Sequence, residues 1–392
     1  MQQEGVVQEM NDILTKKKEK RRVNIRKYTM VIALVAIWVL FSFLDKSGTF
    51  LTPRNLSNLF RQMAVTAVLA MGMFMILVDL HIDLSLGSLV GLTGGVAALL
   101  MYKVGLNPFL AVILTLLLGA VLGAITGSWV NAGVPAFIAS LGGMLAYRGA
   151  IMGLTRGESI PVSQASFRFL GTAYLPKSIG LVLGVIACIV IILSTFKKRK
   201  DRIKFGFKVK PLAMELIYLA VYVISIMLFV LVMNSYKGIP VPIMIVLALA
   251  LVLNFVTTKT RFGRQVFAIG GNKEAAKLSG INIKRRTLQI FIISGLMASV
   301  AGILLTARLG TATTDAGNGF ELDAVASCVI GGTSLLGGEG TVLGAVLGAL
   351  VMASIDNGMS ILNTEAYWQL IVKGIILVVA VFVDIYTKKK SK

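Results

Sequence analysis

Long runs of apolar residues are the feature that most constrains this chain. Residues 212–233, 288–306 and 366–385 are three such runs, and none contains more than two charged side chains. A helix that spans a bilayer needs about 20 mostly apolar residues. The whole chain is 56% hydrophobic and 15% charged, whereas soluble domains are about 45–50% apolar and about 25% charged. The sequence therefore predicts an all-α fold, a polytopic transmembrane helix bundle.

Apolar segments of this kind recur along the whole sequence and predict about 12 spans. The first follows a basic tail, and no small-residue cleavage site comes after it, so it is interpreted as an uncleaved span. The predicted spans are residues 28–44, 61–79, 84–102, 109–127, 132–153, 179–196, 212–233, 241–257, 288–306, 322–335, 341–359 and 366–385.

The distribution of basic residues predicts how these spans are oriented. The chain has 39 Lys and Arg against 18 Asp and Glu, and the basic residues gather in segments 1–27, 197–210, 258–287 and 388–392. Short loops rich in Lys and Arg stay in the cytoplasm. Twelve crossings put all these segments on the cytoplasmic side, whereas a re-entrant 322–335 would send the C-terminal tail outside. We therefore expect a basic tail (1–27), a transmembrane domain (28–387) and a second tail (388–392), with both termini cytoplasmic.

Composition also excludes several classes of function. Despite the net charge of +21, no basic surface interleaved with aromatic residues and no zinc-type spacing is present, so a nucleic-acid partner is not expected. Cys188 and Cys328 lie within apolar runs, which argues against a disulfide framework. A single histidine, His81, excludes a multi-histidine metal site. We expect neither a metal nor a cofactor.

Glycine recurs at four-residue spacing within two of the predicted spans. This spacing places the glycines on one helix face, where they allow close helix packing; a flexible pore lining is the alternative. The two sets are Gly119, Gly123 and Gly127, and Gly340, Gly344 and Gly348.

The longest charged loop, 258–287, is predicted to contain a short, well-capped helix. Gly270 and Gly271 interrupt the preceding segment. Asn272 can then cap a helix from Lys273 to about Ser279, which Gly280 ends. A rigid helix outside the bilayer could receive force from a cytoplasmic motor. A structured connector is the alternative.

Several motifs resemble one known family. They are residues 83–88 (Asp-Leu-Ser-Leu-Gly-Ser), 134–138 (Val-Pro-Ala-Phe-Ile), 262–264 (Phe-Gly-Arg), 268–281 (Ala-Ile-Gly-Gly-Asn-Lys-Glu-Ala-Ala-Lys-Leu-Ser-Gly-Ile) and 328–335 (Cys-Val-Ile-Gly-Gly-Thr-Ser-Leu). Together they resemble the permeases of monosaccharide ABC importers, in the ribose, xylose and galactose branch, over nearly the whole chain beyond residue 50. Residues 353–360 and 367–369 look most like the xylose members. So does an extra pair of spans around 179–233, beyond the roughly 10 spans of the ribose type.

This resemblance implies a transport subunit, not an enzyme, in a bacterial inner membrane. It implies a homodimer, an ABC ATPase inside and a sugar-binding protein outside, with D-xylose favoured and ribose, galactose or arabinose as alternatives. The sequence contains no Gly-x-x-x-x-Gly-Lys-[Ser/Thr] phosphate loop, so ATP hydrolysis is assigned to another chain. The resemblance further implies an ATPase-coupling segment made of Gly270, Gly271, Asn272, Lys273, Glu274, Ala275, Ala276 and Gly280.

Polar residues within or beside apolar runs are candidates for the sugar pathway. An ionised side chain at the bilayer centre costs about 2.5–3.5 kcal/mol on insertion scales, so such groups normally face protein or water. The candidates are Asp83, Ser85, Phe137, Glu321, Asp323, Asp356 and Asn357. Helix capping is the alternative for the acidic residues, space filling the alternative for the aromatic one, and Lys373 is expected to pair with a carboxylate or to snorkel.

A second class of function remains open at this point. Asp79, His81 and Asp83 could form a proton relay in a secondary carrier. A membrane enzyme is disfavoured because no constellation of nucleophile, base or metal ligands is present.

Two weaker expectations concern the ends of the bundle. Loops 45–58, 154–178 and 307–320 are expected to form a landing surface for the binding protein, with plain solvated loops as the alternative. Residues 82–88 and 321–324 each place an acidic group before a glycine-rich segment, as in an internally duplicated transporter with broken helices.

Overall fold

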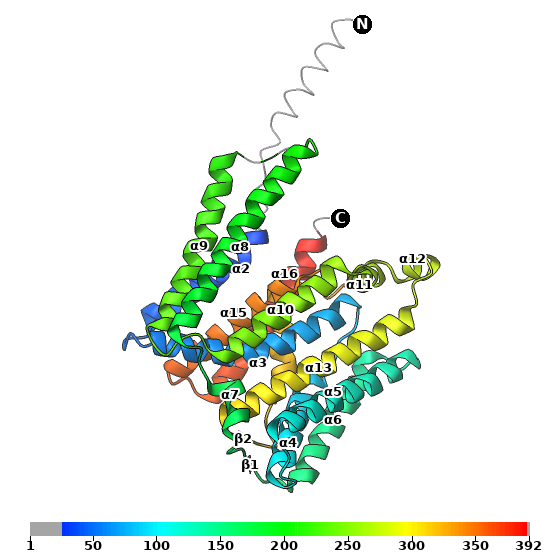
Figure 1. The fold of residues 1–392 in the computed structure, drawn as a ribbon. Helices are drawn as coiled ribbons and strands as arrows, with labels where there is room; N and C mark the ends of the chain where they lie inside the picture. Colours follow the sequence, from blue (N-terminus) through cyan, green and yellow to red (C-terminus); the bar gives the residue numbers. More distant parts are fainter. Residues whose placement is uncertain (1–25, 208, 210, 390–392) are drawn as a thin grey trace, which may run out of the picture.

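The computed structural model describes residues 26–207, 209 and 211–389 as a helical bundle (Figure 1), which confirms the predicted all-α class. Two short strands, β1 (Ile160–Pro161) and β2 (Thr311–Ala312), pair antiparallel. The helices are α2 (Arg26–Leu44), α3 (Pro53–Val78), α4 (Leu86–Tyr102), α5 (Pro108–Asn131), α6 (Ala136–Thr155), α7 (Ala165–Thr172), α8 (Lys177–Lys204), α9 (Leu212–Asn234), α10 (Val241–Lys259), α11 (Arg261–Gly271), α12 (Lys273–Leu278), α13 (Ile283–Leu309), α14 (Phe320–Ile330), α15 (Val342–Ile361) and α16 (Ala366–Lys389).

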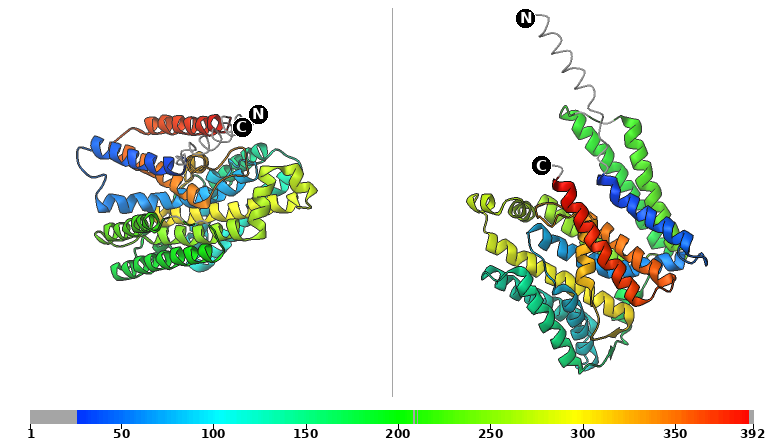
Figure 2. Two further views of the ribbon diagram at one scale, coloured as in Figure 1. Left: turned by 90° about the horizontal axis from the view of Figure 1, so that it is seen from above. Right: turned by 180° about the vertical axis from the view of Figure 1, so that it is seen from behind.

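Three helices form the centre of the bundle. The most apolar windows of α3, α13 and α15 are 83%, 78% and 78% buried, whereas no residue in that of α16 is buried. Figure 2 shows α16 at one edge of the bundle and α8 at the opposite edge, with α3 and α13 between them. The exposed faces of the outer helices are apolar, for example at Leu370, Val378 and Phe382 of α16. Such surfaces are suited to lipid, so the chain is a multi-pass membrane protein.

Closely spaced glycines hold the central helices together. A Cβ atom added to Gly123 of α5 would overlap the backbone of Phe291 in α13, and one added to Gly348 of α15 would overlap the backbone of Ser327 in α14. Gly119 and Gly344 lie in equally close contact with α13 and with Gly331 respectively. The predicted role in helix packing is therefore confirmed for these glycines, whereas Gly340 precedes α15 and, at φ 147°, does not lie on a helix face.

The helices agree with the predicted spans in place but not all in length. Among the described residues, nine helices are long and apolar enough to cross a membrane, and α4 and the Met30–Leu44 part of α2 are shorter apolar helices. The predicted span 322–335 contains only α14, whose 11 residues extend about 16 Å, whereas the hydrocarbon layer is about 30 Å thick. Because Gly331–Gly332 and the coil that follows do not continue the helix, α14 alone cannot cross.

Segments predicted to lie outside the membrane are joined at one end of the bundle. The β1–β2 pair connects 154–178 to 307–320 through Ile160 and Ala312. Helix α7, which was not predicted, inserts Phe167 into the core beside this pair. The guanidinium of Arg61 in α3 lies 5.5 Å from the centre of the Tyr174 ring. The segment 154–178 therefore also contacts the first part of α3, next to residues 45–58.

Candidate functional site

The short helix α12 protrudes from the end of the bundle that is opposite the β1–β2 pair (Figure 1). The Asn272 side-chain oxygen accepts a hydrogen bond from the Ala275 N–H at 2.9 Å, as expected for an N-cap. At the other end the Gly280 N–H donates to Lys277 O and the Ile281 N–H donates to Ala276 O. With Gly280 at φ 77°, these bonds form a Schellman C-cap. The predicted capped helix is confirmed.

The chain just before helix α12 is packed against the membrane helices. Only Ala276 of α12 is buried, and the side chain of Leu278 is 89% exposed. Just before α12, a Cβ atom on Gly270 would overlap Val78 O at the end of α3 and lie 2.5 Å from Gly338 N. The Gly338 N–H itself donates to Val78 O at 3.1 Å. The loop that holds α12 is therefore locked to α3 and to the coil after α14.

Two helix starts meet inside the bundle. Helix α4 begins at Leu86 and α14 begins at Phe320. A Cβ atom on Gly87 would overlap the Glu321 carboxylate and lie 2.5 Å from Gly317 O. Gly87 and Gly317 lie near the inner end of α4, whose 17 residues extend about 25 Å. The chain between α13 and α14, residues 310–319, therefore returns into the bundle beside α4 and is called the dipping segment. The two segments predicted to contain broken helices, 82–88 and 321–324, thus lie together.

A groove lined by both polar and apolar side chains opens beside this meeting point. It has a volume of about 430 Å³ and is lined by α4, α6 and the dipping segment. Arg148 of α6 donates hydrogen bonds to Thr314 O and Ala316 O at 2.5 and 3.0 Å, which fixes the dipping segment against α6. Asp315 and Asn318 are exposed and Glu321 is half-buried. The groove offers both donors and acceptors on an otherwise apolar bundle.

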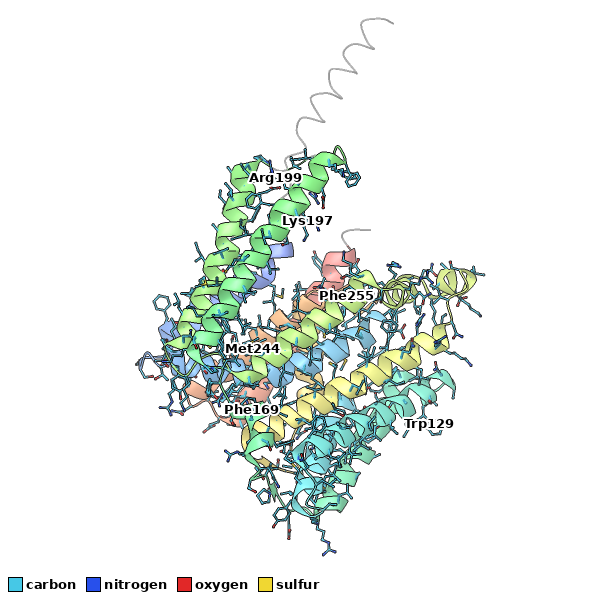
Figure 3. The ribbon with its side chains drawn as sticks, viewed as in Figure 1. Trp129, Phe169, Lys197, Arg199, Met244 and Phe255 are labelled. Atoms are coloured by element: carbon cyan, nitrogen blue, oxygen red, sulfur yellow. The ribbon has the colours of Figure 1, made fainter. Side chains whose placement is uncertain are left out.

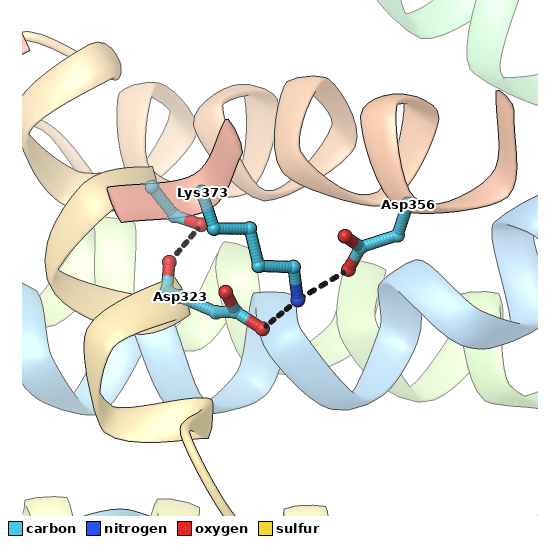
Figure 4. A network of polar contacts seen from close by, with 4 residues as sticks. Asp323, Asp356 and Lys373 are labelled. Atoms are coloured by element: carbon cyan, nitrogen blue, oxygen red, sulfur yellow. Dashed lines mark hydrogen bonds and ion pairs between the residues drawn. The ribbon is translucent and has the colours of Figure 1, made fainter. Parts of the chain in front are cut away.

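A lysine joins three helices near the same depth (Figure 4). The Lys373 ammonium of α16 lies 3.0 Å from Asp323 Oδ2 of α14 and 2.9 Å from Asp356 Oδ2 of α15. The Ser327 hydroxyl donates to the Asp323 carbonyl oxygen at 2.6 Å. The expected pairing of Lys373 is confirmed. The one cation between two carboxylates therefore links α14, which is too short to cross the membrane alone, to α15 and α16.

The chain between α3 and α4 carries the residues considered for a proton relay. Asp79 Oδ2 accepts a hydrogen bond from the Thr287 hydroxyl at 2.8 Å. Burial raises the pKa of Asp79 to about 6 and lowers the pKa of His81 to about 4, so His81 is neutral at pH 7. The 3.7 Å approach of His81 to Asp79 is therefore not an ion pair. Asp83 bonds to the N–H and hydroxyl of Ser85, as the capping alternative predicts.

Comparison with known proteins decides the family. Residues 55–381 match the family described as the permease component of the branched-chain amino acid transport system. The chain belongs to this permease family. No solved structure matches the permease.

The relatives of this permease are sugar transport subunits. It is 43% identical to the xylose transport system permease protein XylH of Escherichia coli K12 over 95% of this chain and 94% of the relative. It is also 43% identical to XylH of Haemophilus influenzae over 94% and 99%. Identity to the ribose import permease protein RbsC of Escherichia coli K12 is 35% over 90% and 92%. The predicted family is confirmed, as is the prediction of a transport subunit, not an enzyme.

The predicted pathway residues fall into separate places in the permease. Asp323 and Asp356 meet at Lys373, and Asp83 and Ser85 lie at the start of α4. Asn357 instead exchanges two amide hydrogen bonds with Asn55 of α3, at 2.8 and 3.0 Å. The side chain of Phe137 is 51% exposed on the outer face of α6.

The groove residue Arg148 was missed in the sequence. It is the one charged side chain in the predicted span 132–153. An ionisable residue within a span is by default a functional candidate, so this signal was available. Asn318 and Asp315 gave no such signal, because they precede α14 in a segment that sequence periodicity assigns to a loop.

Proposed function

We propose that this permease forms the membrane pathway of an ATP-driven importer for a monosaccharide, with D-xylose as the favoured sugar. The observation that carries this proposal is the 43% identity to two xylose permeases over nearly the full length of each chain. The ribose permeases at 35% and 33% identity make ribose the second choice. In this scheme a sugar-binding protein delivers the sugar from outside and an ABC ATPase works from the cytoplasm.

Helix α12 is the proposed contact with the ATPase. Its side chains Lys273, Glu274 and Lys277 are exposed, while Ala276 is buried against the rest of the protein. The close contact of Gly270 with Val78 and Gly338 supports this role. Because the backbone atoms touch, a displacement of α12 would directly displace α3 and the coil that follows α14.

The groove beside Arg148 and Glu321 is the proposed sugar subsite. Its volume of about 430 Å³ lies within the range of about 300–1,000 Å³ common for small-molecule sites. Hydroxyl groups need both donors and acceptors, which Arg148, Asn318 and Glu321 supply. Selectivity can remain modest here if the binding protein chooses the sugar.

A second copy of the chain is proposed to cover this groove. The groove is lined by residues of α4, α6 and the segment before α14, and α6 lies at an edge of the bundle (Figure 1). Charged side chains at membrane depth rarely face lipid, so we expect them to line a water-filled path. A homodimer that places two such grooves face to face would supply it.

The proposed topology keeps 12 crossings, cytoplasmic termini and an inner-membrane location. Helix α14 is too short to cross, but the coil after it reaches Val78 and Gly270, at the end of the bundle that carries α12. The dipping segment, α14 and this coil together would then make one complete crossing, consistent with the positive tails lying on one side.

Reconstitution tests the proposal. Vesicles containing the permease, its ATPase and its binding protein should take up labelled xylose only when ATP is present on the side of the membrane where the ATPase lies. Glu321→Gln should lower the uptake rate about tenfold through loss of one charged acceptor, whereas Glu365→Gln, in the exposed turn before α16, should leave it unchanged. Accumulation of xylose by the permease alone, without ATP, would refute the scheme.

The proton-coupled alternative predicts a different outcome. A carrier that relays protons through Asp79, His81 and Asp83 would stop working in Asp79→Asn and would not need Glu274. The arrangement disfavours this alternative because the Asp83 carboxylate accepts hydrogen bonds from the N–H and the hydroxyl of Ser85. Uptake by Asp79→Asn in the same vesicles distinguishes the two.

A further inference from the structure

The helices α8 and α9 form a hairpin at the edge of the bundle, and lipid must surround most of it. Only 17% of the apolar window of α8 and 11% of that of α9 are buried. The two helices pack on each other where Gly184 meets Val230. Figure 1 shows that the far end of the hairpin extends beyond the neighbouring helices. The groups at this end therefore meet the membrane surface and not the protein core.

The far end of the hairpin is strongly basic. Residues 197–204 include six Lys or Arg and one Asp, and Figure 3 places Lys197 and Arg199 there. The apolar part of α8 before them, residues 178–196, has a length of about 28 Å. Because the hydrocarbon layer is about 30 Å thick, the basic residues lie at the level of the lipid headgroups.

A cavity separates the two helices at this level. Its volume is about 520 Å³, and the ion pair between Arg199 of α8 and Glu215 of α9 bridges it. Lys198, Asp201 and Arg202 line it from α8, while Glu215, Tyr218 and Tyr222 line it from α9. With Arg199 paired to Glu215, Lys198 and Arg202 outnumber the one remaining carboxylate, Asp201, and tyrosine is a residue preferred at the membrane–water interface.

We propose that this cavity binds the headgroup of an anionic phospholipid. Lys198 and Arg202 would contact the phosphate, since basic pockets between transmembrane helices at the cytoplasmic surface suit anionic headgroups. The tyrosine hydroxyls can donate to the glycerol or phosphate oxygens, and the apolar walls of the hairpin can accept the acyl chains. The site is separate from the groove at Arg148 and does not depend on which sugar is transported.

The test measures lipid retention by the purified full chain. In native mass spectrometry, wild-type protein should keep phosphatidylglycerol and release phosphatidylcholine of the same acyl composition. The double variant Lys198→Gln/Arg202→Gln should bind phosphatidylglycerol roughly 30-fold more weakly, which corresponds to about 1 kcal/mol for each hydrogen bond to the phosphate that is lost. The charge-preserving variant Lys198→Arg/Arg202→Lys should retain most of the binding.

A matched control separates a site from general attraction. Lys197→Gln/Lys200→Gln removes the same charge from the same helix, but neither residue lines the cavity, so phosphatidylglycerol retention should stay within about twofold of wild type. Equal losses in the two double variants would overturn the proposal in favour of diffuse surface attraction. Equal retention of phosphatidylcholine by the wild type would overturn it as well.

Discussion

Gly270 and Gly271 are neighbours in sequence but differ sharply in their surroundings. A Cβ atom on Gly270 would lie 2.5 Å from Gly338 N and still closer to Val78 O, whereas one on Gly271 would have no neighbour within 4 Å. Both contacts of Gly270 are backbone atoms, which cannot rotate away. Gly270→Ala should therefore displace α11 from α3, and Gly271→Ala should not.

The size of this effect can be worked from the contacts. Overpacking costs about 1–3 kcal/mol, and a strained Gly338–Val78 hydrogen bond adds about 0.5–1.5 kcal/mol. Alanine offsets about 1 kcal/mol of this through its higher helix propensity. A net cost of about 0.5–3.5 kcal/mol shifts the equilibrium between seated and displaced α11 by roughly 2- to 400-fold. Gly271→Ala should be neutral or slightly stabilising.

The assay compares ATP hydrolysis and sugar uptake in the same vesicles. For Gly270→Ala we expect a lower midpoint temperature and a loss of uptake per ATP hydrolysed, because force on α12 no longer reaches α3. Gly271→Ala should match the wild type in both measurements. If the two variants behaved alike, or if Gly270→Ala transported normally, the mechanical role assigned to this contact would be wrong.

Three further changes probe the rest of the bundle. Lys373→Met should cost about 3 kcal/mol, since it leaves two carboxylates together in the membrane; replacing both carboxylates by amides in the same protein should restore part of the midpoint temperature. Asn357→Ala should lower the free energy of unfolding by about 1–3 kcal/mol, because the amide it pairs with on α3 loses a partner. The free energy of unfolding of Asp79→Asn should rise relative to that of the wild type as pH increases from about 4 to about 6. The reason is that the folded wild type binds the Asp79 proton more tightly than its unfolded chain does. Midpoint temperatures of the two proteins that differ by the same amount at pH 4.5 and pH 7.5 would contradict this.

Local patterns in the sequence were sufficient for the helices and for the coupling segment. Runs of about 20 apolar residues leave no other fold in lipid, and Asn272 and Gly280 specify the ends of α12 through hydrogen bonds to their immediate neighbours. The pairing of Lys373 with a carboxylate could also be predicted from the sequence, because a charge inside a span needs a partner.

Only the tertiary structure decided which distant residues meet. The sequence could not tell that Asp323 and Asp356 share Lys373, or that Asn357 pairs with Asn55 of α3. Hydropathy records how apolar a segment is but not which face it presents or how deeply a loop returns into the bundle. The groove at Arg148 arises because close contact between Gly87 and Gly317 draws the segment before α14 inward, and that contact depends on helices more than 200 residues apart.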